Sequence, residues 1–202
     1  MGEPIFLGFG DLYATAGDHI GHFYQTREEW KAILIPFFTA GLRAGEQCVY
    51  MLPPGPGEQD IRTALRAAEI DVEHALASGQ LILAPGKTTA TAMREWFQTL
   101  IAAIPGHYRL LRWGGDMTWS LRQMPTSEML MEWETLCNTL QDLPAIFLCQ
   151  YDLTRFLGSV VVDALRTHPL CIIHNVIHRN PFYTPPSVFL AELRSRQGKK
   201  SS

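Results

Sequence analysis

Short apolar runs alternate with longer amphipathic segments along this chain, and this alternation constrains the fold more than any other feature. The apolar runs predict strands at residues 19–24, 48–52, 81–84, 108–113, 145–151 and 170–177. Helical periodicity occupies residues 26–42, 58–77, 88–104, 126–143 and 153–167, and a short helix is expected from about residue 187. Strands separated by helices of this length require crossover connections. The sequence therefore predicts an α/β fold with a mostly parallel central sheet flanked by helices on both faces.

The first predicted helix has a well-marked beginning and an interruption. Thr26 followed three residues later by Glu29 is a capping box, in which each side chain satisfies a backbone N–H of the first turn. Pro36 lies inside the helix and predicts a kink, because proline cannot donate the helical hydrogen bond. Gly45 is expected to mark the end of the helix.

Composition limits the classes of protein to which the chain can belong. The 202 residues carry a net charge of -3, are 47% hydrophobic and 18% charged, and fit one domain over residues 1–190 followed by a basic, disordered tail over 191–202. Without an overall basic field, no direct nucleic-acid binding is expected. No stretch approaches the ~20 apolar residues of a membrane span. The four cysteines form no C-x-x-C pair, which favours buried free thiols in a reducing cytoplasm.

A phosphate-binding loop is missing where an ATPase of this architecture would have one. The first strand leads into Thr26-Arg27-Glu28-Glu29, whose carboxylates would repel a phosphate at the helix N-terminus. Pro85-Gly86-Lys87-Thr88 is similar to the end of a phosphate loop, but the first glycine of the pattern is replaced by Leu81. Either this loop binds an anion, or Thr88 or Thr89 simply caps a helix.

Ligands of open α/β sheets bind beyond the carboxyl ends of the strands, so candidate ligand-binding residues are expected there. The glycines of Gly114-Gly115 either admit a ligand or make a turn beside core tryptophans, and Asp152 either meets a ligand or caps the next helix. An apolar pocket with a few polar anchors is expected. The predicted ligand-binding residues are His19, Phe23, Tyr24, Arg112, Asp116, Trp119, Tyr151, Asp152 and His174.

Histidine spacing argues against a metal site built within one strand. His19 and His22 are three residues apart and should lie on opposite faces of a strand. His174 and His178 would share a face but lie about 13 Å apart, too far to hold one ion. No metal is predicted, and a hydrogen-bonded His19 or His174 lining the pocket is preferred. The same residues leave open whether these histidines bind a metal or cofactor, and no cofactor is assigned.

Several stretches, in order, resemble the MEDS family, a sensory domain of methanogens and methylotrophs named after a dichloromethane-responsive repressor. The resemblance covers about residues 10 to 190. It implies a three-layer RecA/KaiC-like fold that lacks the ATPase loop and senses small hydrocarbon derivatives, with a kinase, STAS or transcription-regulator partner. The matching stretches are Gly17-Asp18-His19-Ile20, Phe23-Tyr24, residues 38–50, Gly115-Asp116-Met117-x-Trp119, Cys149-Gln150-Tyr151-Asp152, Arg166-Thr167-His168-Pro169 and residues 180–186.

Three hypotheses of function follow. The first is a non-catalytic sensory domain that binds a small organic ligand and passes the signal to a protein partner. The second is a degenerate nucleotide-handling enzyme using His19, Asp116 and Asp152, although no paired nucleophile and base is visible. The third is a ligand-free scaffold in a signalling complex. A homodimer is compatible with each of them.

Overall fold

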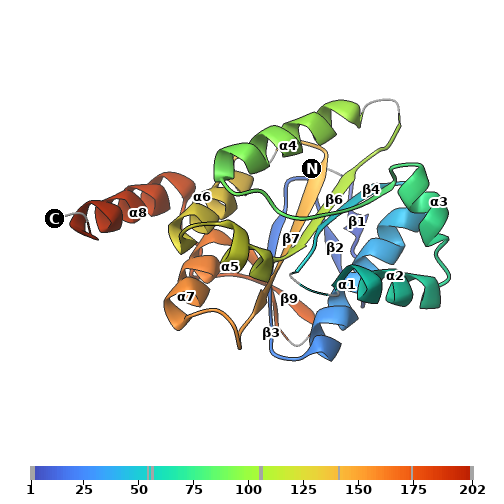
Figure 1. Cartoon of the computed structure of the whole chain (residues 1–202), viewed down its shortest axis with the longest axis horizontal. Helices are drawn as coiled ribbons and strands as arrows, with labels where there is room; N and C mark the ends of the chain where they lie inside the picture. Colours follow the sequence, from blue (N-terminus) through green and yellow to red (C-terminus); the bar gives the residue numbers. More distant parts are fainter. Residues whose placement is uncertain are drawn as a thin grey trace.

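A seven-stranded sheet forms the centre of the molecule in the computed structural model, which describes residues 3–53, 55, 57–104, 107–140, 142–173 and 175–200 (Figure 1). The strand order is β5-β4-β6-β7-β3-β8-β9. All neighbouring strands are parallel except β8 and β9, which are antiparallel. The predicted mostly parallel sheet is confirmed. The strands are β3 (His19–Tyr24), β4 (Gln47–Met51), β5 (Leu81–Ala84), β6 (Leu111–Asp116), β7 (Ala145–Asp152), β8 (Leu170–Ile173) and β9 (Val176–Arg179).

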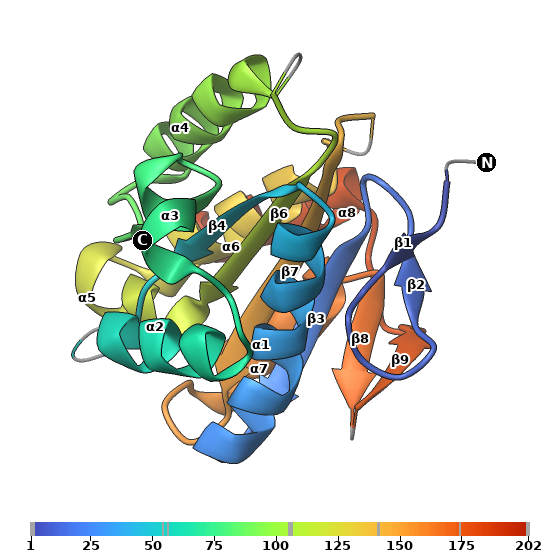
Figure 2. The same ribbon diagram turned by 90° about the vertical axis from the view of Figure 1, so that its right-hand side faces the viewer.

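Helices cover both faces of this sheet and give three layers (Figure 2). Alternate residues of each strand point to opposite faces, so Val49 of β4 packs in one core and Tyr50 in the other. The first core lies under α4 (Ala90–Ala103), α6 (Ser127–Cys137), α7 (Gly158–Thr167) and α8 (Pro186–Lys200). The second lies under α1 (Arg27–Arg43), α2 (Gly57–Ala67) and α3 (Val72–Ala77), beside the hairpin of β1 (Ile5–Phe6) and β2 (Tyr13–Ala14).

The expected capping box opens α1. The Thr26 side chain accepts from the N–H of Glu29, whose carboxylate accepts from the N–H of Thr26. The helix continues through Pro36 to Arg43. Gly8, with a φ of 99°, lies directly against it, because a Cβ there would be 2.0 Å from the Pro36 carbonyl oxygen. This contact seats the N-terminal hairpin on α1.

Three elements are shorter in the structure than the sequence predicted, because a backbone turn or a side-chain hydrogen bond interrupts each of them. The single helix expected over 58–77 is broken into α2 and α3, since Glu69 has a φ of 60° and Asp71 caps α3. The strand expected over 170–177 is a hairpin of β8 and β9 that turns at Asn175, whose φ is 62°. The helix expected from residue 153 begins only at Gly158, because the Asp152 carboxylate accepts from the N–H and hydroxyl of Thr154 and forms a turn.

The strand expected over 108–113 lies three residues later, as β6, and is followed by the short helices η1 (Met117–Trp119) and α5 (Ser120–Gln123). The C-terminal segment also differs from the expected disordered tail, because α8 continues to Lys200 and extends outward from the body (Figure 1). Phe189 and Leu193, one helical turn apart, are buried and hold α8 in the first core. Within the described residues, no helix is both long and apolar enough to cross a bilayer.

Candidate functional site

Four buried side chains from separate parts of the chain meet on one face of the sheet. His19 comes from β3, Glu134 from α6, Cys149 from β7, and His168 directly follows α7. One nitrogen, oxygen or sulfur atom of each lies within 4.8 Å of the others. The His19 Nε2 is 3.0 Å from Glu134 Oε2 and 3.4 Å from Cys149 Sγ. The His168 Nε2 is 3.3 Å from the same Glu134 oxygen. We call these four residues the buried centre.

The register of β3 and β7 places the strand residues of this site. His19 is paired with Phe147, Gly21 with Cys149, and Phe23 with Tyr151. Because side chains alternate along a strand, the side chains of these paired residues lie on the same face of the sheet. Gly21 leaves room for the neighbouring imidazole, since a Cβ at that position would be 3.0 Å from the Cγ of His168. The glycine therefore allows the two histidines to approach, and their ring centroids are 4.0 Å apart.

Surrounding hydrogen bonds fix the tautomer of both imidazoles. The Asn138 amide nitrogen donates to the carbonyl oxygens of Glu134 and Thr167, which turns its Oδ1 toward the His19 Nδ1 at 3.2 Å. The His168 Nδ1 lies 2.6 Å from the carbonyl oxygen of Ala164. Both Nδ1 atoms must therefore carry hydrogen and donate. In the neutral rings, each Nε2 is then a lone pair that points into the buried centre.

The buried centre has more acceptors than donors. Two imidazole lone pairs face one carboxylate oxygen, and among the described residues the His168 Nε2 has no hydrogen-bond partner. The second carboxylate oxygen of Glu134 already accepts from the Tyr151 hydroxyl at 2.7 Å. All four groups are shielded from water. Such an arrangement needs a positive charge between the acceptors, either a shared proton or a metal cation.

The close approach of these buried groups also shifts the pKa values of Glu134, His19 and Cys149. Burial alone raises the pKa of the Glu134 carboxyl, but His168 and His19 in their protonated form outweigh it and hold that pKa well below its ordinary range. Burial, and then His168, lowers the pKa of His19. Burial and the Glu134 carboxylate raise the pKa of the Cys149 thiol well above its ordinary value. A bound cation would reverse the effect on the thiol, because metals bind the thiolate.

The geometry fits a small divalent cation. Zinc bonds of 2.0–2.3 Å to nitrogen, oxygen and sulfur imply ligand separations of about 3.4 Å in a tetrahedron. Three of the separations, at 3.0, 3.3 and 3.4 Å, lie at or slightly below that value, and the others lie within 4.8 Å. Two imidazoles, a carboxylate and a thiol form a ligand set that zinc accepts. Outer hydrogen bonds from both imidazoles to carbonyl groups are also typical of metal-binding histidines.

A cavity of about 500 Å³ opens beside β3, near the carboxyl end of that strand. Its wall is mainly apolar, with a few polar groups from His22, Gln25, Glu29 and Asn175, as expected of a site for a small organic molecule. Phe23 lines the cavity and stacks on Tyr151 behind it. We call this the strand-end cavity. Its lining residues are His22, Phe23, Gln25, Glu29, Leu153, Val161, Leu165, Ile173 and Asn175.

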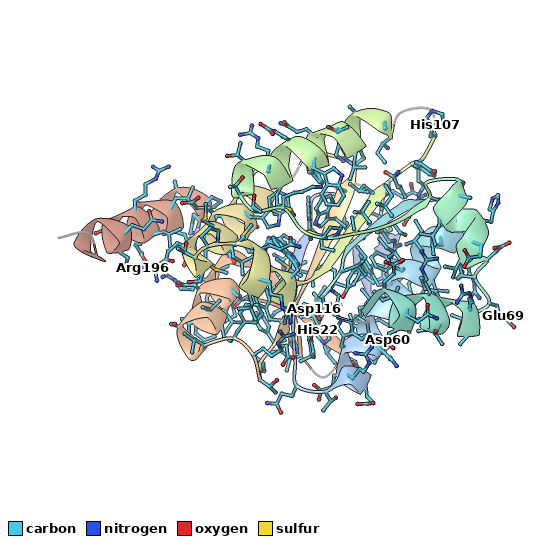
Figure 3. All side chains as sticks on the ribbon, in the orientation of Figure 1. His22, Asp60, Glu69, His107, Asp116 and Arg196 are labelled. Atoms are coloured by element: carbon cyan, nitrogen blue, oxygen red, sulfur yellow. The ribbon has the colours of Figure 1, made fainter. Side chains whose placement is uncertain are left out.

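A second, smaller cleft of about 170 Å³ holds Tyr24, Asp116 and Asp152 at the ends of three adjacent strands. Figure 3 shows His22 and Asp116 toward the same end of the sheet. The Tyr24 hydroxyl donates to Asp116 at 2.9 Å, and the Thr118 amide and hydroxyl donate to the other carboxylate oxygen. Burial raises the pKa of Asp116. With these acceptors satisfied, Asp116 acts as a cap for the turn after β6.

Other predicted ligand-binding residues lie apart from the strand-end cavity and from the smaller cleft. Arg112 is buried under α1, where it pairs with Glu46 and donates to the carbonyl oxygens of Phe37 and Phe6. Trp119 is buried in the first core, close to Gly86. Tyr151 is buried between the strand-end cavity and the buried centre. His174 is outside the described residues.

The glycine–lysine loop has the features of a helix start. Thr89 caps α4 by accepting from the N–H of Ala92. The Lys87 ammonium lies over the Trp96 ring, 4.5 Å from its centroid. Gly86 is in contact with Trp119, so the backbone there is committed to packing. Of the two alternatives for this loop, the structure contains the helix cap, which Thr89 forms.

Sequence reasoning missed the partners of His19. The expectation that His19 and His22 face opposite sides is correct, since His19 meets α6 while His22 lies with Gln150 and the carbonyl of Trp30. Histidine spacing within single strands predicted no metal site, whereas the buried centre is built from four separate parts of the chain. One signal was available: Glu134 is a charged residue on the apolar face of α6. A charge in that position needs a buried partner.

Comparison with known proteins places the chain in a family. The model of the MEthanogen/methylotroph, DcmR Sensory domain matches residues 18–169. The chain belongs to the MEDS family. The matched span includes all four residues of the buried centre. The transcriptional repressor DcmR of Methylorubrum extorquens is 32% identical over 155 residues, which cover 75% of this chain and 58% of the repressor. The chain therefore spans little more than half the length of that relative. A sensory or regulatory role is what the family's description as a sensory domain supports.

Solved structures support the RecA-like fold. The flagellar accessory protein FlaH from Methanocaldococcus jannaschii gives a TM-score of 0.53 at 10% identity, covering 80% of this chain and 75% of FlaH. A KaiC-like protein from Pyrococcus horikoshii gives 0.56 at 13% identity, covering 78% of this chain and 70% of that protein. At these identities the likeness concerns the fold alone. The RecA/KaiC-like architecture expected of the MEDS family is confirmed.

Proposed function

We propose that this MEDS-family chain is a non-catalytic sensor that binds a small organic molecule in the strand-end cavity, beside a buried centre that holds a divalent metal ion. One observation carries the metal centre: the Nε2 lone pairs of His19 and His168 converge on a single oxygen of Glu134, and the Cys149 thiol lies 3.4 Å from the His19 Nε2. The repressor relative supports a regulatory role, in which the signal passes to a transcription-regulator, kinase or STAS partner. The apolar cavity wall supports an uncharged, hydrocarbon-like ligand.

The alternative to a metal is a proton shared within the buried centre. Glu134→Gln separates the two cases. If the centre is an imidazolium–carboxylate pair, the glutamine removes one partner of a buried ion pair and costs about 3–5 kcal/mol. If the centre is a metal site, the metal-free protein depends on the same shared proton, and the glutamine costs a similar amount there. The two cases then differ when metal is added, because the ion stabilises wild type and leaves Glu134→Gln unchanged.

The first experiment measures metal directly. Purified wild-type protein is analysed by elemental mass spectrometry and titrated with Zn²⁺ and Co²⁺. We expect one ion per chain, with Co²⁺ absorption typical of tetrahedral coordination that includes a thiolate. Glu134→Gln should bind no ion at the same concentrations. Wild-type protein that neither contains nor binds an ion would refute the metal centre.

The second experiment tests the ligand. Thermal unfolding is followed with small halogenated and methylated organic compounds, dichloromethane and toluene included, because a ligand that binds only the folded state raises the midpoint. Val161→Phe narrows the strand-end cavity and should abolish the shift. Val162→Phe, on the exposed side of α7, is the matched control and should keep it. If no compound in the series raises the midpoint of wild type, the organic-ligand half of the proposal is wrong.

A further inference from the structure

A continuous chain of contacts joins the strand-end cavity to the buried centre. Phe23 forms part of the cavity wall. Its ring stacks on Tyr151 with centroids 5.5 Å apart and planes inclined by 20°. The Tyr151 hydroxyl donates to Glu134 Oε1 at 2.7 Å, and its ring packs edge-on against His168 at 5.8 Å. Two side chains therefore span the distance from the cavity to two residues of the buried centre.

Tyr151 has little freedom to move without disturbing the buried centre. It is fully buried, with Phe23 on one side and Phe156 on another, 5.3 Å between ring centroids. Close packing transmits a displacement because a filled interior has no space to absorb it. The Glu134 carboxylate uses one oxygen for this phenol and the other for both imidazoles. A shift of the phenol thus turns the oxygen that faces the histidines.

We propose that Tyr151 is a positioning residue that couples occupancy of the strand-end cavity to metal affinity at the buried centre. A molecule in the cavity presses on Phe23, Phe23 displaces the Tyr151 ring, and the phenol carries Glu134 with it. Because such coupling is reciprocal, the metal ion changes the affinity for the cavity ligand by the same factor. The coupling rests on the proposed function, since it requires a metal at the buried centre.

The coupling predicts a non-additive pair of substitutions. Val161→Phe places a ring in the strand-end cavity as a built-in occupant, and Tyr151→Phe keeps the stacked ring but removes the hydroxyl on Glu134. Allosteric coupling is typically 5–150-fold in affinity. We expect Val161→Phe to weaken Co²⁺ binding at least about 5-fold in the wild-type background and less than about 2-fold in the Tyr151→Phe background. Val162→Phe should change neither.

Co²⁺ titration followed by its visible absorption distinguishes the outcomes. A metal-binding wild type with the expected non-additive cycle supports the relay. A metal-binding wild type in which Val161→Phe has the same effect in both backgrounds overturns the relay and leaves the metal centre in place. A wild type that binds no Co²⁺ overturns both, because the cavity then has nothing to be coupled to. Toluene titrated with and without Co²⁺ provides the reciprocal measurement on unmodified protein.

Discussion

His19 and His22 stand three residues apart on β3 and are both buried, yet their surroundings differ in kind. On the α1 face, the Gln150 amide donates to the His22 Nδ1 at 2.9 Å, so the lone pair of a neutral imidazole has a donor. On the α6 face, His19 shares a single carboxylate oxygen with a second imidazole. The comparison teaches that burial does not distinguish a structural histidine from a functional one. The balance of donors and acceptors does.

The largest expected difference between the two faces is in metal-dependent stability. With Zn²⁺ at 1,000 times its Kd, wild type should gain about 4 kcal/mol in unfolding free energy. His19→Gln should lose this gain because it removes a ligand, whereas His22→Gln should keep it. Urea unfolding of the three proteins with zinc and with a chelator measures the effect. An equal loss in both variants would mean that zinc acts elsewhere or that both substitutions disturb the sheet alike.

The second-largest expected difference between the two faces of β3 is in how stability depends on pH. Burial, opposed in part by the Glu29 carboxylate, lowers the pKa of His22 from 6.5 to about 4. The unfolded chain takes up a proton as the pH falls through 6.5, but the folded protein resists until about 4. Above pH 6.5, burying a neutral His22 therefore costs no stability through protonation. As the pH falls from 6.5 toward 4, the free energy of unfolding should decrease by roughly 3 kcal/mol. In metal-free protein, His22→Gln should remove that part of the pH dependence. Parallel stability profiles of the two proteins would contradict it.

A third difference concerns the outer hydrogen bonds of the buried centre. Asn138→Ala removes the acceptor of the His19 Nδ1, so metal affinity should fall about 10–100-fold. Thr139→Ala, at the exposed neighbour, is the matched control and should leave the affinity unchanged. Competition with a coloured chelator gives both values. Asn138→Ala with wild-type affinity would show that the orientation of His19 is set by packing alone.

The smallest expected effect is on the α1 face of β3. Gln150→Leu removes donors to the His22 Nδ1 and to the carbonyl oxygen of Trp30, and should cost about 1 kcal/mol of stability. Metal affinity should not change, although Gln150 adjoins Cys149 in sequence. Denaturant midpoints and a Zn²⁺ titration test the two halves of this prediction. A loss of metal affinity would mean that the two faces of β3 are not independent.

The sequence predicted the layers of this fold far better than its site. Apolar runs and capping signals act locally, so β3, α1 and the parallel sheet followed from periodicity. The break at Glu69 and the hairpin at Asn175 were missed, because non-glycine residues with positive φ carry no strong sequence signal. The buried centre was missed for another reason. Its residues are separated by 115 positions between His19 and Glu134, and only the strand register and the packing of α6 bring them together.

Gly21 touches both halves of the proposed sensor. A methyl group added there would lie 3.0 Å from the His168 ring and 3.2 Å from the Phe23 ring, closer than ordinary contact allows. One carbon atom would thus push on a metal ligand and on the cavity wall together, while β3 kept its place in the sheet. In evolutionary terms, a lineage could retune or silence the proposed sensor through a single codon, without rebuilding the rest of the domain.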